Sequence, residues 1–306
     1  MKSSGNLWAL ILAGGEGMRV RDLTKCAQGN PVPKQFFSLD GTESLLRWTV
    51  SRAARIVPME RIVTVVADQH RRWWEKDLSD FQSENVIVQP ENRGTAPGIL
   101  LPLLEILRRD RMAKLIVMPS DHYVESEDVL QEALLEAVET VHLDNGRVLL
   151  LGITPEACET GFGWIVSSDS PDNSSPARVE AFIEKPDWIT AQMLMSRGAL
   201  VNSLIFVTTG TALLEIYALA VPQLLRDFIG GREEISGKCP DLSRLYRSLE
   251  TYDFSREVLE RSYDYLSVLP VPACGWTDIG SPERLKPFQE RRAPVSRTTQ
   301  YAVPLS

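Results

Sequence analysis

The chain has 306 residues, of which 43% are hydrophobic and 24% charged, and it carries a formal net charge of -8. This composition is typical of globular proteins and excludes the disordered and fibrous classes, and the length suffices for one large core without structural staples. The acidic balance argues against nucleic acid as a partner, because binding a phosphate backbone needs clustered Lys and Arg.

The first half of the chain alternates short apolar runs with amphipathic stretches. The predicted strands are 7–12, 62–66, 86–89, 115–118 and 148–151, and the predicted helices are 44–56, 69–81, 96–109 and 127–142. Strands that alternate with helices indicate βαβ units, and these build a parallel sheet covered on both faces. The predicted fold class is α/β, with a Rossmann-like mixed, mostly parallel sheet flanked by helices.

Beyond residue 151 the pattern changes to antiparallel additions. Strands are predicted at 164–168, 179–183, 204–207 and 265–269, and helices at 188–197, 212–218, 242–250 and 256–261. Residues 1–285 are expected to form one domain. The stretch 286–306 is expected to be a partly ordered C-terminal tail, because residues 293–306 show no convincing periodicity.

A glycine-rich run follows the first predicted strand directly. It reads Leu12, Ala13, Gly14, Gly15, Glu16, Gly17, Met18, Arg19. Glycines at the carboxyl end of a first parallel strand let backbone N–H groups approach an anion, and Arg19 could then contact phosphate oxygens. The dinucleotide fingerprint needs a third glycine where Val20 stands, and the Gly-Lys-Ser/Thr of the P-loop is absent. The run therefore predicts a phosphate-binding loop, with a merely tight turn as the alternative.

Two charged positions come next along the chain. Lys34, in the segment 33–36, could reach the same phosphates as a point charge, although by itself this lysine is better explained as a solvated side chain beside a turn. Asp121 follows the predicted strand 115–118, at the sheet edge where ligands of open parallel sheets bind, and its carboxylate suits a cation that bridges phosphates. A helix cap formed by Ser120 and Asp121 is the alternative. Three histidines do not suffice for a zinc cluster.

Three downstream segments are also candidates. Gly161 and Gly163 open a predicted strand and suit either a bulge or a close approach of the backbone to a ligand. Glu184 and Lys185 end the strand 179–183 and offer a carboxylate for hydroxyl groups and an ammonium for a phosphate. Asp278, read as the end of a late strand, is a second acidic candidate for a metal. Each of them alone fits a structural role as well as a functional one.

Taken together and in this order, these segments resemble the sugar-phosphate nucleotidyltransferases, nearest the mannose-1-phosphate guanylyltransferase branch. The segments that carry the resemblance are 12–19, 33–36, 89–97, 119–122, 182–186, 202–203 and 276–278, spread over residues 7–285. The resemblance implies the nucleotide-diphospho-sugar transferase type of fold. It also implies Mg²⁺-dependent transfer of a nucleotidyl group from a nucleoside triphosphate, best matched by GTP, to a hexose 1-phosphate, best matched by mannose 1-phosphate. Residues 1–285 would be the catalytic domain.

The resemblance also implies roles for individual residues. The catalytic residues would be Arg19, Lys34, Asp121 and Lys185, and the Mg²⁺ ligands Asp121 and Asp278. The nucleotide would be bound by Leu12, Ala13, Gly14, Gly15, Gly17, Met18, Gln89, Asn92, Arg93, Thr95, Ala96, Pro97 and Ser120. The sugar would be bound by Gly161, Gly163, Glu184 and Asn202.

The chain departs from the family pattern at several positions. Residues are added around 26–30, Leu204 stands where a glycine commonly follows the Asn-Ser pair, Ser255 stands where an Asp is expected, and Trp164 replaces a common Tyr. The stretch 281–306 leaves no room for the β-helix or isomerase domain of longer relatives. Another nucleotide and sugar pair, or a non-catalytic nucleotide-sugar-binding paralogue, are the alternatives. A dehydrogenase is disfavoured by the missing fingerprint glycine.

Location and assembly rest on weaker signals. The longest apolar stretches are far shorter than the roughly 20 residues that span a bilayer, and the N-terminus lacks the layout of a secretory signal, so we expect a cytoplasmic protein without membrane contact. The cysteines, expected to be reduced thiols because no CxxC pair occurs, are Cys26, Cys158, Cys239 and Cys274. A homodimer is expected from the general frequency of dimers among such enzymes.

Overall fold

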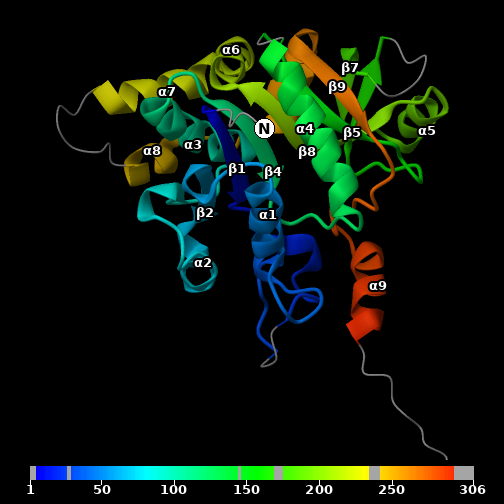
Figure 1. The fold of residues 1–306 in the computed structure, drawn as a ribbon, viewed down its shortest axis with the longest axis horizontal. Helices are drawn as coiled ribbons and strands as arrows, with labels where there is room; N and C mark the ends of the chain where they lie inside the picture. Colours follow the sequence, from blue (N-terminus) through cyan, green and yellow to red (C-terminus); the bar gives the residue numbers. More distant parts are fainter. Residues whose placement is uncertain (1–4, 26–28, 144–145, 169–174, 234–241, 293–306) are drawn as a thin grey trace, which may run out of the picture.

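The computed structural model describes residues 5–25, 29–143, 146–168, 175–233 and 242–292. In this part of the chain, nine strands form one mixed sheet in the order β3-β2-β1-β4-β8-β5-β9-β7-β6, and helices pack on both faces (Figure 1). The expected Rossmann-like α/β fold is confirmed. No helix among the described residues is long and apolar enough to cross a membrane.

The strands combine two parallel groups with antiparallel partners. Their bounds are β1 Leu7–Ala13, β2 Ile62–Ala67, β3 Val86–Gln89, β4 Lys114–Pro119, β5 Val148–Ile153, β6 Gly163–Ser167, β7 Ala177–Glu184, β8 Leu200–Thr209 and β9 Leu266–Val271. Strands β3, β2, β1 and β4 are parallel, as are β5 and β9. The antiparallel β8 lies inside the sheet, between β4 and β5, and begins before its predicted start at residue 204.

The helices follow the prediction except at three places. Their bounds are α1 Leu45–Ala54, α2 Arg71–Asp77, α3 Thr95–Arg109, α4 Glu127–Leu143, α5 Trp188–Ser196, α6 Gly210–Ala220, α7 Pro222–Glu233, α8 Leu242–Ser248 and α9 Pro282–Arg292. α7 and α9 were not predicted, because a glycine pair weakens α7 and Pro287 lies inside the polar α9. The predicted helix 256–261 is a π-helix at Ser255–Leu259 followed by a 3₁₀ segment at Glu260–Tyr265.

Two apolar cores lie on the two faces of the sheet, and β1 contributes to both. Leu7, Ala9 and Ile11 belong to the core that α1 and α4 cover, whereas Trp8 and Leu10 belong to the core under α3 and α6. Successive side chains of a strand point to opposite faces, so a strand buried on both faces must be apolar throughout. This burial explains the uninterrupted hydrophobic run with which the chain begins its fold.

A buried ion pair connects α1 to the first turn of α4. The guanidinium of Arg52, whose side chain is only 1% exposed, donates to both carboxylate oxygens of Glu127, at 2.8 and 2.7 Å. Burial removes the charge of Arg52 from water at a cost in free energy, and the two hydrogen bonds to Glu127 offset that cost. The pair thereby fixes the two helices on one side of the sheet.

The loops that matter for function lie where β1 and β4 end. In Figure 1 the blue segment that follows β1 and the red α9 lie at the same lower end of the molecule. A two-way backbone bridge between Tyr123 and Thr277, with N–H to O distances of 2.9 Å, joins the loop after β4 to the loop after β9. Segments far apart in the sequence therefore meet at one edge of the sheet.

Several expectations concern residues outside the described ranges. The tail at 293–306 and the thiols of Cys26 and Cys239 lie there, while Cys158 and Cys274 are free thiols. The helix α9 runs across residue 285, the expected end of the domain.

Candidate active site

A crevice of about 400 Å³ opens at the carboxyl ends of β1 and β4. It is lined by most of the residues that sequence reasoning singled out, namely Leu12, Gly14, Gly15, Arg19, Lys34, Gln89, Asn92, Thr95, Ser120, Asp121, Gly161, Gly163, Glu184, Lys185, Asn202 and Asp278. Ligands of open α/β sheets bind at this edge.

The glycine loop is open to the crevice and held from behind. Gln35 Nε2 donates to the carbonyl oxygens of Ala13 at 3.0 Å and Gly15 at 2.8 Å. Gly14 packs so closely that a Cβ there would lie 2.5 Å from Gln89 Nε2, and Gly15 is exposed. The loop is therefore a preformed backbone surface beside the crevice, as an anion-binding loop requires.

Lys34 lies between the two aspartates. Its side chain is only 6% exposed, and Nζ contacts Asp121 Oδ2 at 2.8 Å and also donates to the backbone carbonyl oxygen of Asp278. Burial by itself would raise the pKa of Asp121, but the charge of Lys34 lowers it below the ordinary value. Asp121, 37% exposed, is thus an ionised carboxylate in the crevice.

His122 supports this arrangement as a neutral ring. Trp276 Nε1 donates to His122 Nδ1 at 3.2 Å, so the remaining ring proton belongs on Nε2, which lies 3.7 Å from Asp121 Oδ1. Burial lowers the pKa of His122 to about 4, against the opposing charge of Asp121. The histidine is therefore uncharged at neutral pH and acts here as a hydrogen-bonding group.

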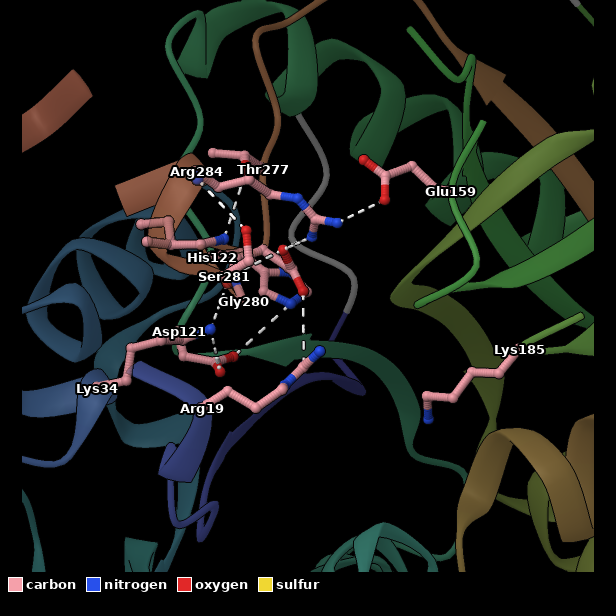
Figure 2. Close-up of polar contacts among 12 residues, drawn as sticks. Arg19, Lys34, Asp121, His122, Glu159, Lys185, Thr277, Gly280, Ser281 and Arg284 are labelled. Atoms are coloured by element: carbon pink, nitrogen blue, oxygen red, sulfur yellow. Dashed lines mark hydrogen bonds and ion pairs between the residues drawn. The ribbon is translucent and has the colours of Figure 1, made fainter. Parts of the chain in front are cut away.

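Asp278 is held by two arginines and its own turn. Its Oδ1 accepts from the N–H of Gly280 at 2.9 Å and pairs with the guanidinium of Arg284, while its Oδ2 lies 3.9 Å from Arg19 (Figure 2). The sequence placed Asp278 at the end of a late strand, which is wrong. It lies in a loop beyond β9, which ends at Val271, and the bridge to Tyr123 brings that loop to the crevice.

The opposite wall carries the candidate sugar residues. Glu184 Oε1 pairs with Lys185 Nζ at 2.8 Å, and burial raises the pKa of Glu184, opposed by that hydrogen bond. A Cβ on Gly163 would lie 2.6 Å from Glu184 Oε2 and 2.7 Å from the ring of Phe182, so a larger residue here would displace these side chains. Figure 2 shows Lys185 away from the aspartate cluster and without a drawn contact to it. The two groups of charge thus belong to different walls of one crevice.

Asn202 and Leu204 lie in an irregular stretch of β8, where its register with β5 shifts between Leu150 and Gly152. Asn202 lines the crevice, and its Oδ1 accepts the N–H of Leu204 at 3.0 Å, so the group that this side chain can offer a ligand is the donor Nδ2. Leu204 has a φ of 56°, a left-handed conformation that glycine adopts more readily than leucine. The departure noted at this position therefore puts a leucine beside the crevice, with its side chain packed against the core under α3 and α6.

The amino end of α3 forms the third wall. Gly94, with a φ of 92°, lies directly before the helix, and a Cβ there would lie 2.2 Å from the carbonyl oxygen of Tyr252. Thr95 Oγ1 accepts the N–H of Phe254 at 2.7 Å. Asn92 and Gln89 border the same space. A helix begins here with its partial positive charge facing the crevice.

Six of the expected nucleotide-binding residues do not line the crevice, namely Ala13, Gly17, Met18, Arg93, Ala96 and Pro97. Arg93 is turned away because its guanidinium binds Glu91 at 2.6 Å and the carbonyl oxygen of Tyr246 at 2.7 Å. Ala96 and Pro97 are buried inside α3, Ala13 is buried in β1, and Met18 points to solvent. Gly17 packs against Lys34. These six residues lie outside the lining of the crevice, and their contact with the nucleotide stays a prediction.

Sequence reasoning missed other residues of the site. Asp253 and Phe162 line the crevice, and Arg284 bonds Asp278 from α9. An acid was expected at Ser255. Asp253 lies two residues earlier, and the segment Thr251-Tyr252-Asp253 ahead of the helical pattern was the available signal. Arg284 gave no signal, because it lies in a polar stretch interpreted as the end of the domain.

The carboxylates of Asp121 and Asp278 are ligands that suit Mg²⁺. No group of three or more His, Cys, Asp or Glu side chains gathers as a metal cluster in the described residues. Asp121 and Asp278 nevertheless line one crevice, and Lys34 contacts the carboxylate of Asp121 and the backbone carbonyl oxygen of Asp278. Mg²⁺ is bound through one or two carboxylates together with water and substrate phosphates, so two acids beside a phosphate-binding loop suit it.

Comparison with known proteins agrees with this geometry. The family model described as nucleotidyl transferase matches residues 8–291. Mannose-1-phosphate guanylyltransferase of Salmonella montevideo is 31% identical over 292 residues, which cover 89% of this chain and 58% of that protein. Xanthan biosynthesis protein XanB of Xanthomonas campestris pv. campestris is also 31% identical, with 89% and 57% covered. The chain thus spans less than two thirds of the length of these relatives.

A solved structure shares the fold. The crystal structure described as mannose-1-phosphate geranyltransferase from Thermus thermophilus superposes with a TM-score of 0.75 at 26% identity, over 90% of this chain and 76% of that one.

Proposed function

The chain belongs to the nucleotidyl transferase family, and on that basis we propose that it transfers a nucleotidyl group from a nucleoside triphosphate to a hexose 1-phosphate. GTP and mannose 1-phosphate are the proposed pair, because the similar Salmonella protein is named for them. Mg²⁺ is the proposed cofactor, since two carboxylates border the phosphate-binding loop.

One observation carries the proposal. Charged side chains from five separate segments line a single crevice beside an exposed glycine loop, and these are Arg19, Lys34, Asp121, Lys185 and Asp278. A surface that must hold a triphosphate and a sugar phosphate together needs cations and a backbone loop of this kind. A protein that only binds a nucleotide sugar has less need for two acids among those cations.

Nucleotidyl transfer requires that the two phosphates are aligned and that their negative charge is screened, and it needs no nucleophilic side chain. An oxygen of the sugar phosphate forms a bond to the α-phosphorus while the bond from that phosphorus to the bridging oxygen of pyrophosphate breaks, in line. Asp121 and Asp278 would hold Mg²⁺, which when bound screens the charge on the phosphates. Arg19 and Lys185 bind phosphate oxygens from the two walls, and Lys34 holds both acids in place.

We assign the nucleotide base and the sugar to the two walls of the crevice formed by α3 and by the segment around Glu184 and Asn202. The nucleotide base lies at the amino end of α3, against Gln89, Asn92 and Thr95, whose polar atoms border the crevice. The sugar hydroxyl groups are bound by Glu184 and by the amide of Asn202, which donates because its Oδ1 is already used. Buried polar groups of this kind discriminate strongly between substrates that do and do not pair with them.

The test is a matrix of the four ribonucleoside triphosphates against several hexose 1-phosphates, read as pyrophosphate release with Mg²⁺ and with chelator. We expect GTP with mannose 1-phosphate to react fastest and the chelator to stop the reaction. A tenfold preference for UTP or ATP, about 1.4 kcal/mol, would refute the guanylyl assignment. Absence of pyrophosphate with every pair would refute the enzymatic function.

A different hexose 1-phosphate is the second candidate, and Leu204 is the observation that favours it. Leu204 lines the crevice near Asn202, at a backbone position that suits glycine. If Leu204 selects the sugar, Leu204→Gly should alter the ranking of sugar 1-phosphates in the same matrix without altering the ranking of nucleotides.

A further inference from the structure

Arg284 connects two walls of the crevice from outside it. Its guanidinium pairs with Asp278 Oδ1 through Nη1 and with Glu159 Oε2 through Nη2 at 2.7 Å (Figure 2). The guanidinium carbon also lies 4.5 Å from the ring centroid of Phe162. Arg284 comes from α9, and its side chain is 23% exposed.

Asp278 thereby has protein partners at both carboxylate oxygens. One carboxylate oxygen is bound by Arg284 and the N–H of Gly280, and the other faces Arg19 at 3.9 Å. The ion pair of Asp278 with Arg284 is stronger than the one with Arg19. The Arg19 side chain is 67% exposed and lies 3.9 Å away, whereas Arg284 makes a direct contact and is partly shielded from solvent. Arg284 is therefore the main competitor for this carboxylate.

The charges around the two aspartates cancel. The Lys, Arg, Asp and Glu side chains joined by these ion pairs are Arg19, Lys34, Arg284, Asp121, Asp278 and Glu159, three positive and three negative. A free divalent cation is attracted by excess negative charge, and this cluster has none. A cation that arrives on a triphosphate brings its own negative charge and gives the arginines and Lys34 new partners.

We propose that Arg284 withholds Asp278 from free divalent cations, so that the metal enters as its nucleoside triphosphate complex. When the metal takes the Asp278 carboxylate, the guanidinium keeps Glu159 as a partner and Phe162 as a support, so it is not left as an unpaired charge. This role rests on the proposed function, because it takes Asp278 as a metal ligand. Arg284 acts through Asp278 and is a positioning residue.

The test measures binding of Mn²⁺ alone, by the loss of the free-ion resonance signal, without nucleotide. Removing a unit charge about 5 Å from a divalent ion changes its affinity by roughly fivefold even with the dielectric constant of water and salt screening, and by more at the lower value near 20 of a half-buried site. Arg284→Gln is therefore expected to bind Mn²⁺ at least about fivefold more tightly than the wild type. Arg284→Lys, which keeps the charge, should stay close to the wild type. Glu159→Gln leaves Arg284 with Asp278 alone and should bind no more tightly.

If Arg284 only held the loop of Asp278 in place, removing it would loosen the loop and weaken Mn²⁺ binding, which is the opposite of the expected change. Unchanged or weaker Mn²⁺ binding by a folded Arg284→Gln would overturn the proposal. Equally tight binding by Arg284→Gln with Asp278→Asn added would overturn it too, because the gain must come through Asp278. Should Arg284→Gln not fold, Arg284→Met, a second neutral side chain of similar length, takes its place in the same measurement with the same expected and refuting results. Wild-type protein that binds no Mn²⁺ even with GTP would instead count against the proposed function.

Discussion

Replacing Asp121 by Asn changes the charge of the crevice with almost no change in shape. The carboxylate pairs with Lys34 Nζ at 2.8 Å and borders the crevice. The Asn oxygen can still accept from Lys34, so we expect the fold to stay intact and the free energy of unfolding to change by about 1 kcal/mol or less. What is lost is one full negative charge between Lys34 and any bound cation.

The size of the effect follows from that charge. At an effective dielectric constant near 20, a divalent ion about 4 Å from a carboxylate interacts by roughly 8 kcal/mol, much of which is offset by removing both from water. Removing a single preorganised charged or polar group from an active site costs about 10² to 10³ in turnover. We therefore expect Asp121→Asn to lower kcat by at least ~10².

The assay is pyrophosphate release at saturating substrates, together with urea unfolding of the same preparation. Asp128→Asn is the matched control, because Asp128 is an exposed carboxylate paired with Arg55 on the outside of α4. It should keep full activity. Turnover of Asp121→Asn within threefold of the wild type would refute the assignment of Asp121 to the reaction.

Three further changes test other parts of the structure. Gly94→Ala should lower the free energy of unfolding by about 2 kcal/mol or more and weaken nucleotide binding, since the new Cβ would meet the carbonyl oxygen of Tyr252; a urea midpoint equal to that of the wild type would contradict this. Glu127→Ala leaves the buried guanidinium of Arg52 unpaired and should lower the free energy of unfolding in urea by about 3–5 kcal/mol, and Glu127→Gln should lower it less. Equally small decreases in both variants would show that the ion pair does not hold α1 to α4. Burial raises the pKa of Glu184 above its ordinary 4.5, so the carboxylate is protonated at a higher pH than in a free chain, and kcat/KM should fall on the acid side from that higher pH. Glu184→Gln should lower kcat/KM and remove that limb of the pH profile, and an unaltered limb would assign it to another group.

Much of the sheet could be predicted because its strands are local signals. The run that begins at Leu7 is apolar at every position, since β1 is buried on both faces. The glycine loop and Asp121 were placed correctly at the sheet edge because they follow directly from the ends of β1 and β4. A residue that directly follows a strand in the sequence can be assigned to the sheet edge from that one segment alone.

What escaped prediction depends on contacts between distant segments. The place of β8 between β4 and β5 is a matter of strand order, which no local periodicity contains. Asp278 reaches Asp121 through the bridge between Tyr123 and Thr277, and not through a strand end. The helix α9, with Pro287 and few apolar residues, carries no amphipathic pattern, and Arg284 was overlooked with it.

The most direct measurement follows the α-phosphate itself. The purified chain is incubated with Mg²⁺, mannose 1-phosphate and GTP labelled at the α-phosphorus, and the products are separated. Transfer at the crevice places the label in a nucleotide sugar, with one pyrophosphate released for each labelled product, and Asp121→Asn forms neither. Label that stays in GTP, or that is released as free nucleotide without a sugar attached, would contradict nucleotidyl transfer by this protein.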